Sequence, residues 1–194
     1  MTPFTALRAL LPSVLLLCLP ASATTLLRTD LPELTRSADA IVRGTVRRVE
    51  SRWSGDGRRI VTDVEIQVAE SLKGQAGGTV LVTQAGGRVG DIGQRVSGLA
   101  SFSTGEEVVV FLEHRGPQAF NVVGMAQGKY KVQRSAEGGT ATVVPESLGD
   151  SLLLDPTTRQ ATAASPRTMS LSELEASIRS ALQQPPVRTQ EKRP

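Results

Sequence analysis

The chain has 194 residues, of which 39% are hydrophobic and 21% charged, with one cysteine, one histidine and a net charge of +3. The lone Cys18 excludes a disulfide within the chain and a zinc site built from several cysteines. The positive excess is too small to argue for a nucleic-acid partner, and we expect none.

Residues 1–23 have the order of a secretory signal. Arg8 precedes an apolar run from Ala9 to Leu19, and the small residues Ala21-Ser22-Ala23 follow Pro20. The run of about ten residues is too short to cross a bilayer. We therefore expect cleavage after Ala23 and export to the periplasm or the extracellular space of a bacterium. The mature chain then has no cysteine and no transmembrane segment.

A short helix and a long hairpin are expected next. Asp30 caps the helix, and Glu33 lies three residues later, as in a capping box. Residues 40–53 and 58–72 then alternate in polarity, with a phase shift near Arg47-Arg48 that indicates a bulge. Three arginines of the first strand face acids of the second, which predicts cross-strand ion pairs: Arg43, Arg47 and Arg48 opposite Asp63 and Glu65.

Three further strands complete the β region. Residues 79–84 form the third, and residues 106–114 form a fourth that is apolar on both faces and therefore central. Residues 119–133 form a fifth, broken around Met125-Ala126-Gln127, and residues 139–146 a small edge strand. After an irregular stretch, Ser170 caps a final helix whose apolar stripe is Leu171, Leu174, Ile178 and Leu182.

The order of these elements predicts a mainly β chain: a single five-stranded OB-type barrel with a short N-terminal helix and a C-terminal helix. We assign residues 24–145 to the barrel domain and 146–169 to an irregular linker. Residues 170–184 form the C-terminal helix, and residues 185–194 are expected to be a disordered tail.

One stretch carries a family resemblance. Ala38-Asp39 leads into the first long strand, Leu72-Lys73-Gly74 closes the second, and "STGEEVVVFLE" precedes and forms the central strand. This pattern, over Leu31–Val132, resembles the netrin-like module of tissue inhibitors of metalloproteinases. It also resembles exported bacterial proteins of unassigned function with the same body. The resemblance implies an OB-type barrel. Those inhibitors chelate zinc through an N-terminal cysteine, which the mature chain lacks.

Gly149-Asp150-Ser151-Leu152 matches the block that opens the active site of GDSL esterases and lipases. Such a serine needs a histidine base, which in that family follows it in the sequence. His114, the one histidine, precedes Ser151, and no histidine follows. We therefore expect Ser151 to be a turn residue, and the leucines at 152–154 to be a buried segment that ties the C-terminal part to the barrel.

The candidate contact residues lie in two places. The glycine-rich stretch from Gly86 to Gly98 is long for a loop in a compact domain, and such loops often bind partners. It carries Arg88 and Arg95. The second place is the Gln127-Gly128-Lys129 edge; "GMAQGKY" there has only three residues between its glycines, too few for a phosphate loop.

These residues favour an exported, non-enzymatic binding module that recognises a protein, such as an exported protease, or an envelope component. We expect no cofactor and, with a lone histidine, no metal site. The alternative is an exported GDSL-type serine hydrolase that uses Ser151.

Overall fold

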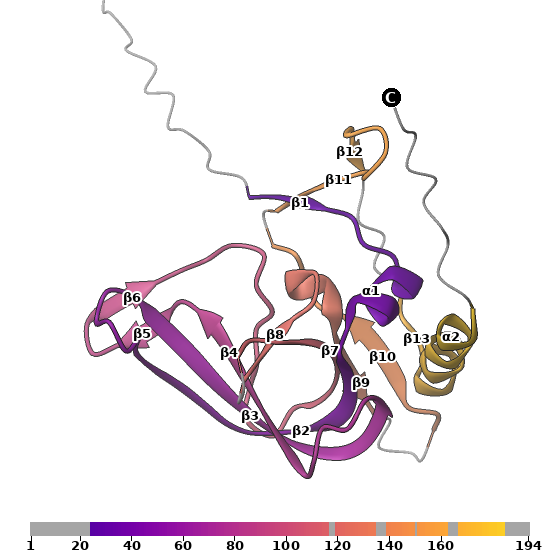
Figure 1. Cartoon of the computed structure of the whole chain (residues 1–194), viewed down its shortest axis with the longest axis horizontal. Coiled ribbons are helices and arrows are strands. Elements are labelled where there is room, and N and C mark those ends of the chain that lie inside the picture. The colour runs from indigo at the N-terminus through magenta and orange to yellow at the C-terminus, as the bar shows by residue number, and fades with distance from the viewer. Residues whose placement is uncertain (1–23, 117–118, 135–138, 150, 163–166, 185–194) are drawn as a thin grey trace, which may run out of the picture.

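The computed structural model describes residues 24–116, 119–134, 139–149, 151–162 and 167–184. The expected signal (1–23) and tail (185–194) lie outside these residues. Five strands close into a barrel in the order β7-β2-β3-β4-β8-β7, and all neighbours are antiparallel except β4 and β8. The predicted mainly β fold with an OB-type barrel and two flanking helices is confirmed (Figure 1). The barrel strands are β2 (Ala40–Trp53), β3 (Ile60–Lys73), β4 (Thr79–Ala85), β7 (Glu107–His114) and β8 (Phe120–Val122).

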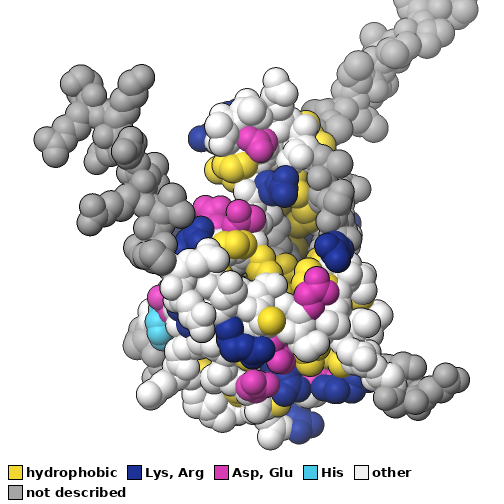
Figure 2. Space-filling view, turned by 90° about the vertical axis from the view of Figure 1, so that its right-hand side faces the viewer, with side chains coloured by type: hydrophobic (Ala, Val, Ile, Leu, Met, Phe, Trp, Pro, Cys, Tyr) yellow, Lys and Arg dark blue, Asp and Glu magenta, His cyan; other side chains and the backbone are white. Residues whose placement is uncertain are grey.

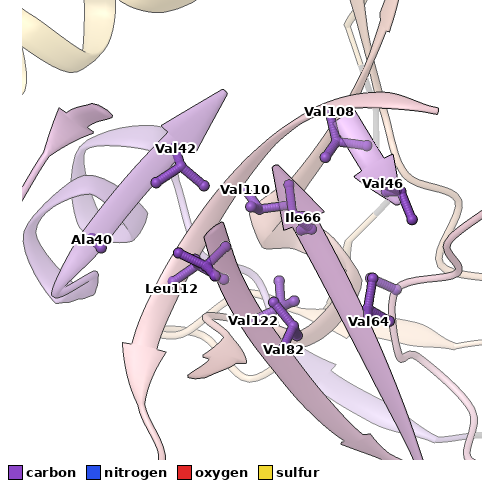
Figure 3. Packing of buried hydrophobic residues seen from close by; sticks show 12 residues of the cluster. Ala40, Val42, Val46, Val64, Ile66, Val82, Val108, Val110, Leu112 and Val122 are labelled. Carbon is purple, nitrogen blue, oxygen red and sulfur yellow. The ribbon is translucent and has the colours of Figure 1, made fainter. Parts of the chain in front are cut away.

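Aliphatic side chains fill the barrel. Because successive residues of a strand face opposite sides of a sheet, every second side chain of each barrel strand points inward. Figure 3 shows these side chains converging from all five strands. None of them is more than 9% exposed. The inner set is Ala40, Val42, Val46, Val64, Ile66, Val80, Val82, Val108, Val110, Leu112 and Val122, with Ala100 added from the segment before β7.

A second core lies between the outside of the barrel and the two helices, α1 (Leu31–Ser37) and α2 (Leu171–Gln183). Strand β7 serves both cores: Val108 and Val110 point into the barrel, while Val109 and Phe111 point to the helix side. The prediction of a central strand with two apolar faces is therefore confirmed. The helices pack side by side over this part of the sheet (Figure 1).

Both helices begin where their caps predict. The Asp30 carboxylate accepts from the Glu33 N–H at 2.8 Å, and the Ser170 hydroxyl accepts from the Glu173 N–H at 3.1 Å. One position of the expected stripe on α2 is wrong. Leu182 is 41% exposed, and the smaller Ala181 is buried in its place beside Ile178.

The β2–β3 hairpin has its predicted bulge, because the register shifts between Val46 and Arg48. The ion pairs are only partly as expected. Arg48 does reach Glu65, at 3.5 Å. Arg43 instead pairs with other acids, Glu70 at 2.8 Å and Glu107 at 3.0 Å. Arg47 donates to the Gln67 amide, and Asp63 pairs with Arg52 at 2.6 Å.

The predicted break in the fifth strand is confirmed. Strand β8 pairs with the end of β7, the 3-10 turn η1 (Met125–Gly128) follows, and β9 (Lys129–Gln133) pairs with the start of β7. Only glycine fits at Gly128, because a Cβ there would lie 2.2 Å from the Val123 carbonyl oxygen. The expected edge strand, β10 (Thr142–Pro145), is not at an edge: it lies between β9 and β13 (Met169–Ser170).

The segment expected to be irregular contains short strands. β11 (Leu152–Leu154) pairs in parallel with β1 (Thr25–Leu27) and antiparallel with β12 (Ala161–Thr162), which forms a small sheet above the barrel (Figure 1). The leucine segment therefore binds the N-terminal strand rather than the barrel wall. Only Leu153 is buried, and Leu152 is 51% exposed. None of the helices in the described part of the chain has the length and hydropathy of a membrane span.

Candidate binding cavity

The glycine-rich stretch is not the irregular loop that the sequence predicted. It folds into a small hairpin of β5 (Gly87–Val89) and β6 (Ile92–Gln94). Gly87 allows the hairpin to approach the β2–β3 hairpin, since a Cβ there would lie 2.2 Å from the Ser51 hydroxyl oxygen. Arg88 is exposed, and its Nε donates to the Gly90 carbonyl at 3.0 Å. Arg95, also exposed, begins the segment that runs on to β7.

A cavity of about 320 Å³ lies between this segment and the chain that follows β10. Its volume is at the lower end of the range of ligand sites. One wall carries the Arg95 cation and the other the Glu146 carboxylate. Hydroxyl groups and two leucines complete a lining of mixed polarity. The lining residues are Arg95, Val96, Ser97, Gly98, Leu99, Ser101, Glu146, Ser147, Leu148 and Gly149.

Lys129 bonds to two residues of the cavity lining but is itself buried. Its side chain is 1% exposed, and its ammonium lies 2.9 Å from both Glu106 Oε1 and Glu146 Oε2. The ammonium also donates a hydrogen bond to the Ser101 carbonyl oxygen. All three N–H donors of the ammonium are therefore satisfied by the protein. A buried side chain with all its donors used does not fit the predicted contact surface, although Lys129 fixes two cavity-lining residues, Ser101 and Glu146.

Gln127 holds the N-terminal strand. Its amide oxygen accepts from the Thr29 N–H at 2.9 Å, and its amide nitrogen donates to the Leu27 carbonyl at 2.9 Å. This is the bonding that the N–H and the C=O of one residue in a parallel neighbouring strand would supply to Leu27 and Thr29. The side chain is only half-buried, but both of its polar ends are occupied. Contact of Gln127 with a partner stays a prediction.

Ser151 lies next to the cavity without an activating base. Its hydroxyl oxygen is buried and has no hydrogen-bond partner among the described residues. It lies close to the Gly98 backbone and to Leu26: a Cβ on Gly98 would be 3.1 Å from the hydroxyl oxygen and 3.0 Å from Leu26 Cδ1. A serine without a bonded base is a weak nucleophile. His114 packs elsewhere, against Phe120, with ring centroids 4.5 Å apart and ring planes tilted by 30°.

A separate network of charges lies on the outer surface of the sheet. Arg134 donates two hydrogen bonds to Glu107, both at 2.8 Å, and Arg43 joins the same carboxylate at 3.0 Å. The bonds from Arg134, followed by those from Arg43, hold the pKa of Glu107 below its usual range, against the opposing effect of burial. Acidic and basic side chains are likewise mixed over the lower part of the helix side (Figure 2).

The structure brings Arg95, Lys129 and Ser151 to the region of one cavity, while Arg88 lies away from its lining. The sequence did not predict the three partners of Lys129, namely Ser101, Glu106 and Glu146, because no motif or regular spacing connects them with the lysine. No three histidine, cysteine or acidic side chains within the described ranges are placed to share a metal ion. No protein-family model matches the chain, and a comparison with curated proteins finds no match either.

Proposed function

We propose that the chain is an exported, non-enzymatic binding module that recognises a protein partner at the Arg95–Glu146 cavity. The observation that carries this proposal is the convergence of two chain segments, 95–101 and 146–149, on one cavity of mixed polarity. Export itself rests on the signal-like residues 1–23.

The walls of the cavity support recognition of a protruding side chain or loop. Arg95 offers a cation, Glu146 a carboxylate that is already paired with Lys129, and Leu99 and Leu148 offer apolar area. Such a combination of an apolar surface with a few placed polar groups is typical of selective sites. The Lys129 ion pairs hold Glu146 in place before a partner arrives, which lowers the entropy cost of binding.

The netrin-like resemblance suggests one class of partner. That resemblance implies an OB-type barrel, and by analogy of fold the corresponding role would be regulation of an exported protease. The zinc-chelating route of the metalloproteinase inhibitors is not part of this proposal, because Thr24 and the residues after it include no cysteine.

Recovery of the partner with a cavity-filling variant tests the proposal. The mature chain, residues 24–194, is immobilised and exposed to the exported fraction of its own cells. Ser147→Trp fills the cavity from its rim, and Ser37→Trp adds the same side chain at the end of α1. A protein retained by the wild type and by Ser37→Trp, but lost with Ser147→Trp, supports the proposal. Equal retention by all three places the contact elsewhere.

The hydrolase alternative ranks second, because no described side chain is bonded to the Ser151 hydroxyl. A serine-reactive phosphonate separates the two classes. Labelling of the mature chain that disappears in Ser151→Ala would establish the hydrolase. The binding module predicts no labelling of either protein.

A further inference from the structure

One end of the molecule combines the outer half of the β2–β3 hairpin with the β5–β6 hairpin. We call residues 47–65 and 87–96 together the distal end. Figure 1 shows β5 and β6 beside the turn of the long hairpin, at the left of the view. The Ile60 N–H donates to Gln94 Oε1 at 3.0 Å, and the Thr62 hydroxyl donates to the Gly86 carbonyl at 2.7 Å. The two hairpins therefore form one platform.

The turn at the tip of this platform is internally braced. The Ser54 N–H donates to the Arg59 carbonyl at 2.7 Å, and the Gly57 N–H donates to the Ser54 carbonyl at 2.8 Å. The Asp56 carboxylate accepts from the Ser54 hydroxyl at 2.6 Å and from the Arg58 N–H at 3.1 Å. The Asp56 carboxylate therefore stabilises the turn through hydrogen bonds, and Arg58 and Arg59 extend from a turn whose backbone is fixed.

Basic side chains are in excess at the distal end, which holds seven arginines and five acidic residues. Arg48 and Arg52 are paired with acids of the same hairpin. Five exposed arginines have no ion pair with a carboxylate of the described residues. One of them, Arg47, donates to the Gln67 amide oxygen, and the guanidinium groups of the other four have no hydrogen bond to another side chain in the described part of the chain. These four are Arg58, Arg59, Arg88 and Arg95. This differs from the helix side of the barrel, where Arg43 and Arg134 are both paired with Glu107.

Apolar side chains are exposed at the same end. Seven large hydrophobic residues of the described chain are exposed, and four of them belong to the distal end. They are Val49, Trp53, Ile92 and Val96, with exposures of 37%, 41%, 56% and 37%. Exposed apolar residues grouped in one region mark an interaction surface more often than single ones do.

From this combination we propose that the distal end binds the surface of a membrane that contains anionic phospholipids. The four unpaired guanidinium groups contact phosphate headgroups, for which arginine is well suited. Trp53 and the aliphatic side chains enter the boundary between headgroups and acyl chains, where tryptophan is enriched. A soluble polyanion would satisfy the arginines but would leave Ile92 and Val96 in water, so the apolar residues favour a lipid surface.

This surface is distinct from the cavity except for Arg95 and Val96, which border both. The tests therefore use other residues, so that a failure here does not bear on the proposed function. Sedimentation of the mature chain with vesicles of phosphatidylcholine, with and without phosphatidylglycerol, measures the binding. Each basic residue near an anionic surface contributes about fivefold in affinity, so Arg58→Gln/Arg59→Gln should weaken binding by roughly 25-fold.

A matched control removes the same charge elsewhere. Arg36→Gln/Arg179→Gln takes two exposed arginines from α1 and α2 and should leave vesicle affinity unchanged. An equal loss in both double variants would show that only net charge matters, which would overturn the proposal. Equal binding to both kinds of vesicle would overturn it as well.

The fluorescence of Trp53 gives a second readout that needs no variant, because it is the only tryptophan in the chain. Its emission should shift to shorter wavelength on phosphatidylglycerol vesicles and be quenched by brominated lipids. Vesicle binding without either change would contradict the proposed orientation. If dextran sulfate or an oligonucleotide binds as tightly as the vesicles do, the partner is a soluble polyanion and the lipid proposal is wrong.

Discussion

The Lys129 ammonium and the Glu146 carboxylate form a buried ion pair, with Nζ 2.9 Å from Oε2. A second carboxylate, Glu106, lies at the same distance from the ammonium, and the Phe102 ring centroid lies 4.8 Å from it. The pair joins β9 to the residue that follows β10 and thereby holds Glu146, which lines the cavity. The attraction within such a pair adds little net stability, because both charges had to leave water. Removing one partner is costly, because the other charge is then buried without a counter-ion.

Lys129→Met should destabilise the protein strongly. The substitution leaves two carboxylates, with side-chain exposures of 7% and 15%, without their cation. Breaking a buried pair in this way costs about 3–5 kcal/mol. Lys131→Met, two residues along the same strand and exposed, is the control and should be close to neutral. Urea denaturation measures both, and equal effects would mean that the ion pairs contribute nothing specific.

Stability should also depend on pH through Glu107. Its folded pKa is held low, chiefly by hydrogen bonds from Arg134. The stabilisation is therefore complete above the unfolded glutamate pKa of about 4.3 and is lost as the pH falls through the lower folded value.

Comparison of the wild type with Glu107→Gln across the acid range checks this expectation. The difference in the free energy of unfolding between the two proteins should be largest near neutral pH and should shrink in acid. A difference that stays constant over the acid range would show that ionisation of Glu107 does not matter.

Gln127→Leu should release the N-terminal strand. The amide supplies one hydrogen bond to Thr29 and one to Leu27, and a hydrogen bond contributes about 0.5–1.5 kcal/mol. Amide hydrogen exchange at Thr29 should accelerate, while amides of the barrel core keep their protection. Gln133→Leu, on an exposed position of β9, is the control. Unchanged exchange at Thr29 would mean that β11 alone holds this strand.

Ser151→Ala should be neutral or slightly stabilising. The hydroxyl oxygen is buried without a hydrogen-bond partner in the described part of the chain, and an unsatisfied buried polar group is unfavourable. Thermal unfolding of the two proteins tests this prediction. A clear loss of stability in the alanine variant would reveal a partner for the hydroxyl.

The sequence was informative where structure depends on local pattern. Alternation along residues 60–68 located the inner face of β3, and the phase shift near Arg47 located the bulge, because both follow from a two-residue period. The caps Asp30 and Ser170 were predictable for the same reason, since each interacts with a residue three positions later.

What escaped prediction depends on contacts between distant parts of the chain. Strands of three residues, such as β1 and β11, carry no periodic signal, and their pairing joins Leu26 to Leu153. The burial of Lys129 depends on Glu106 and Glu146, which approach it only once the barrel has formed. Lysines are seldom fully buried, so exposure was the natural expectation for Lys129.

Nuclear magnetic resonance tests the central claim most directly. Once the partner has been recovered, it is added to the labelled mature chain and the backbone amide shifts are followed. Recognition at the cavity predicts that the largest changes occur at Arg95–Leu99 and Glu146–Gly149, the two segments that line it. Changes concentrated elsewhere, with these two segments unaffected, would contradict the account.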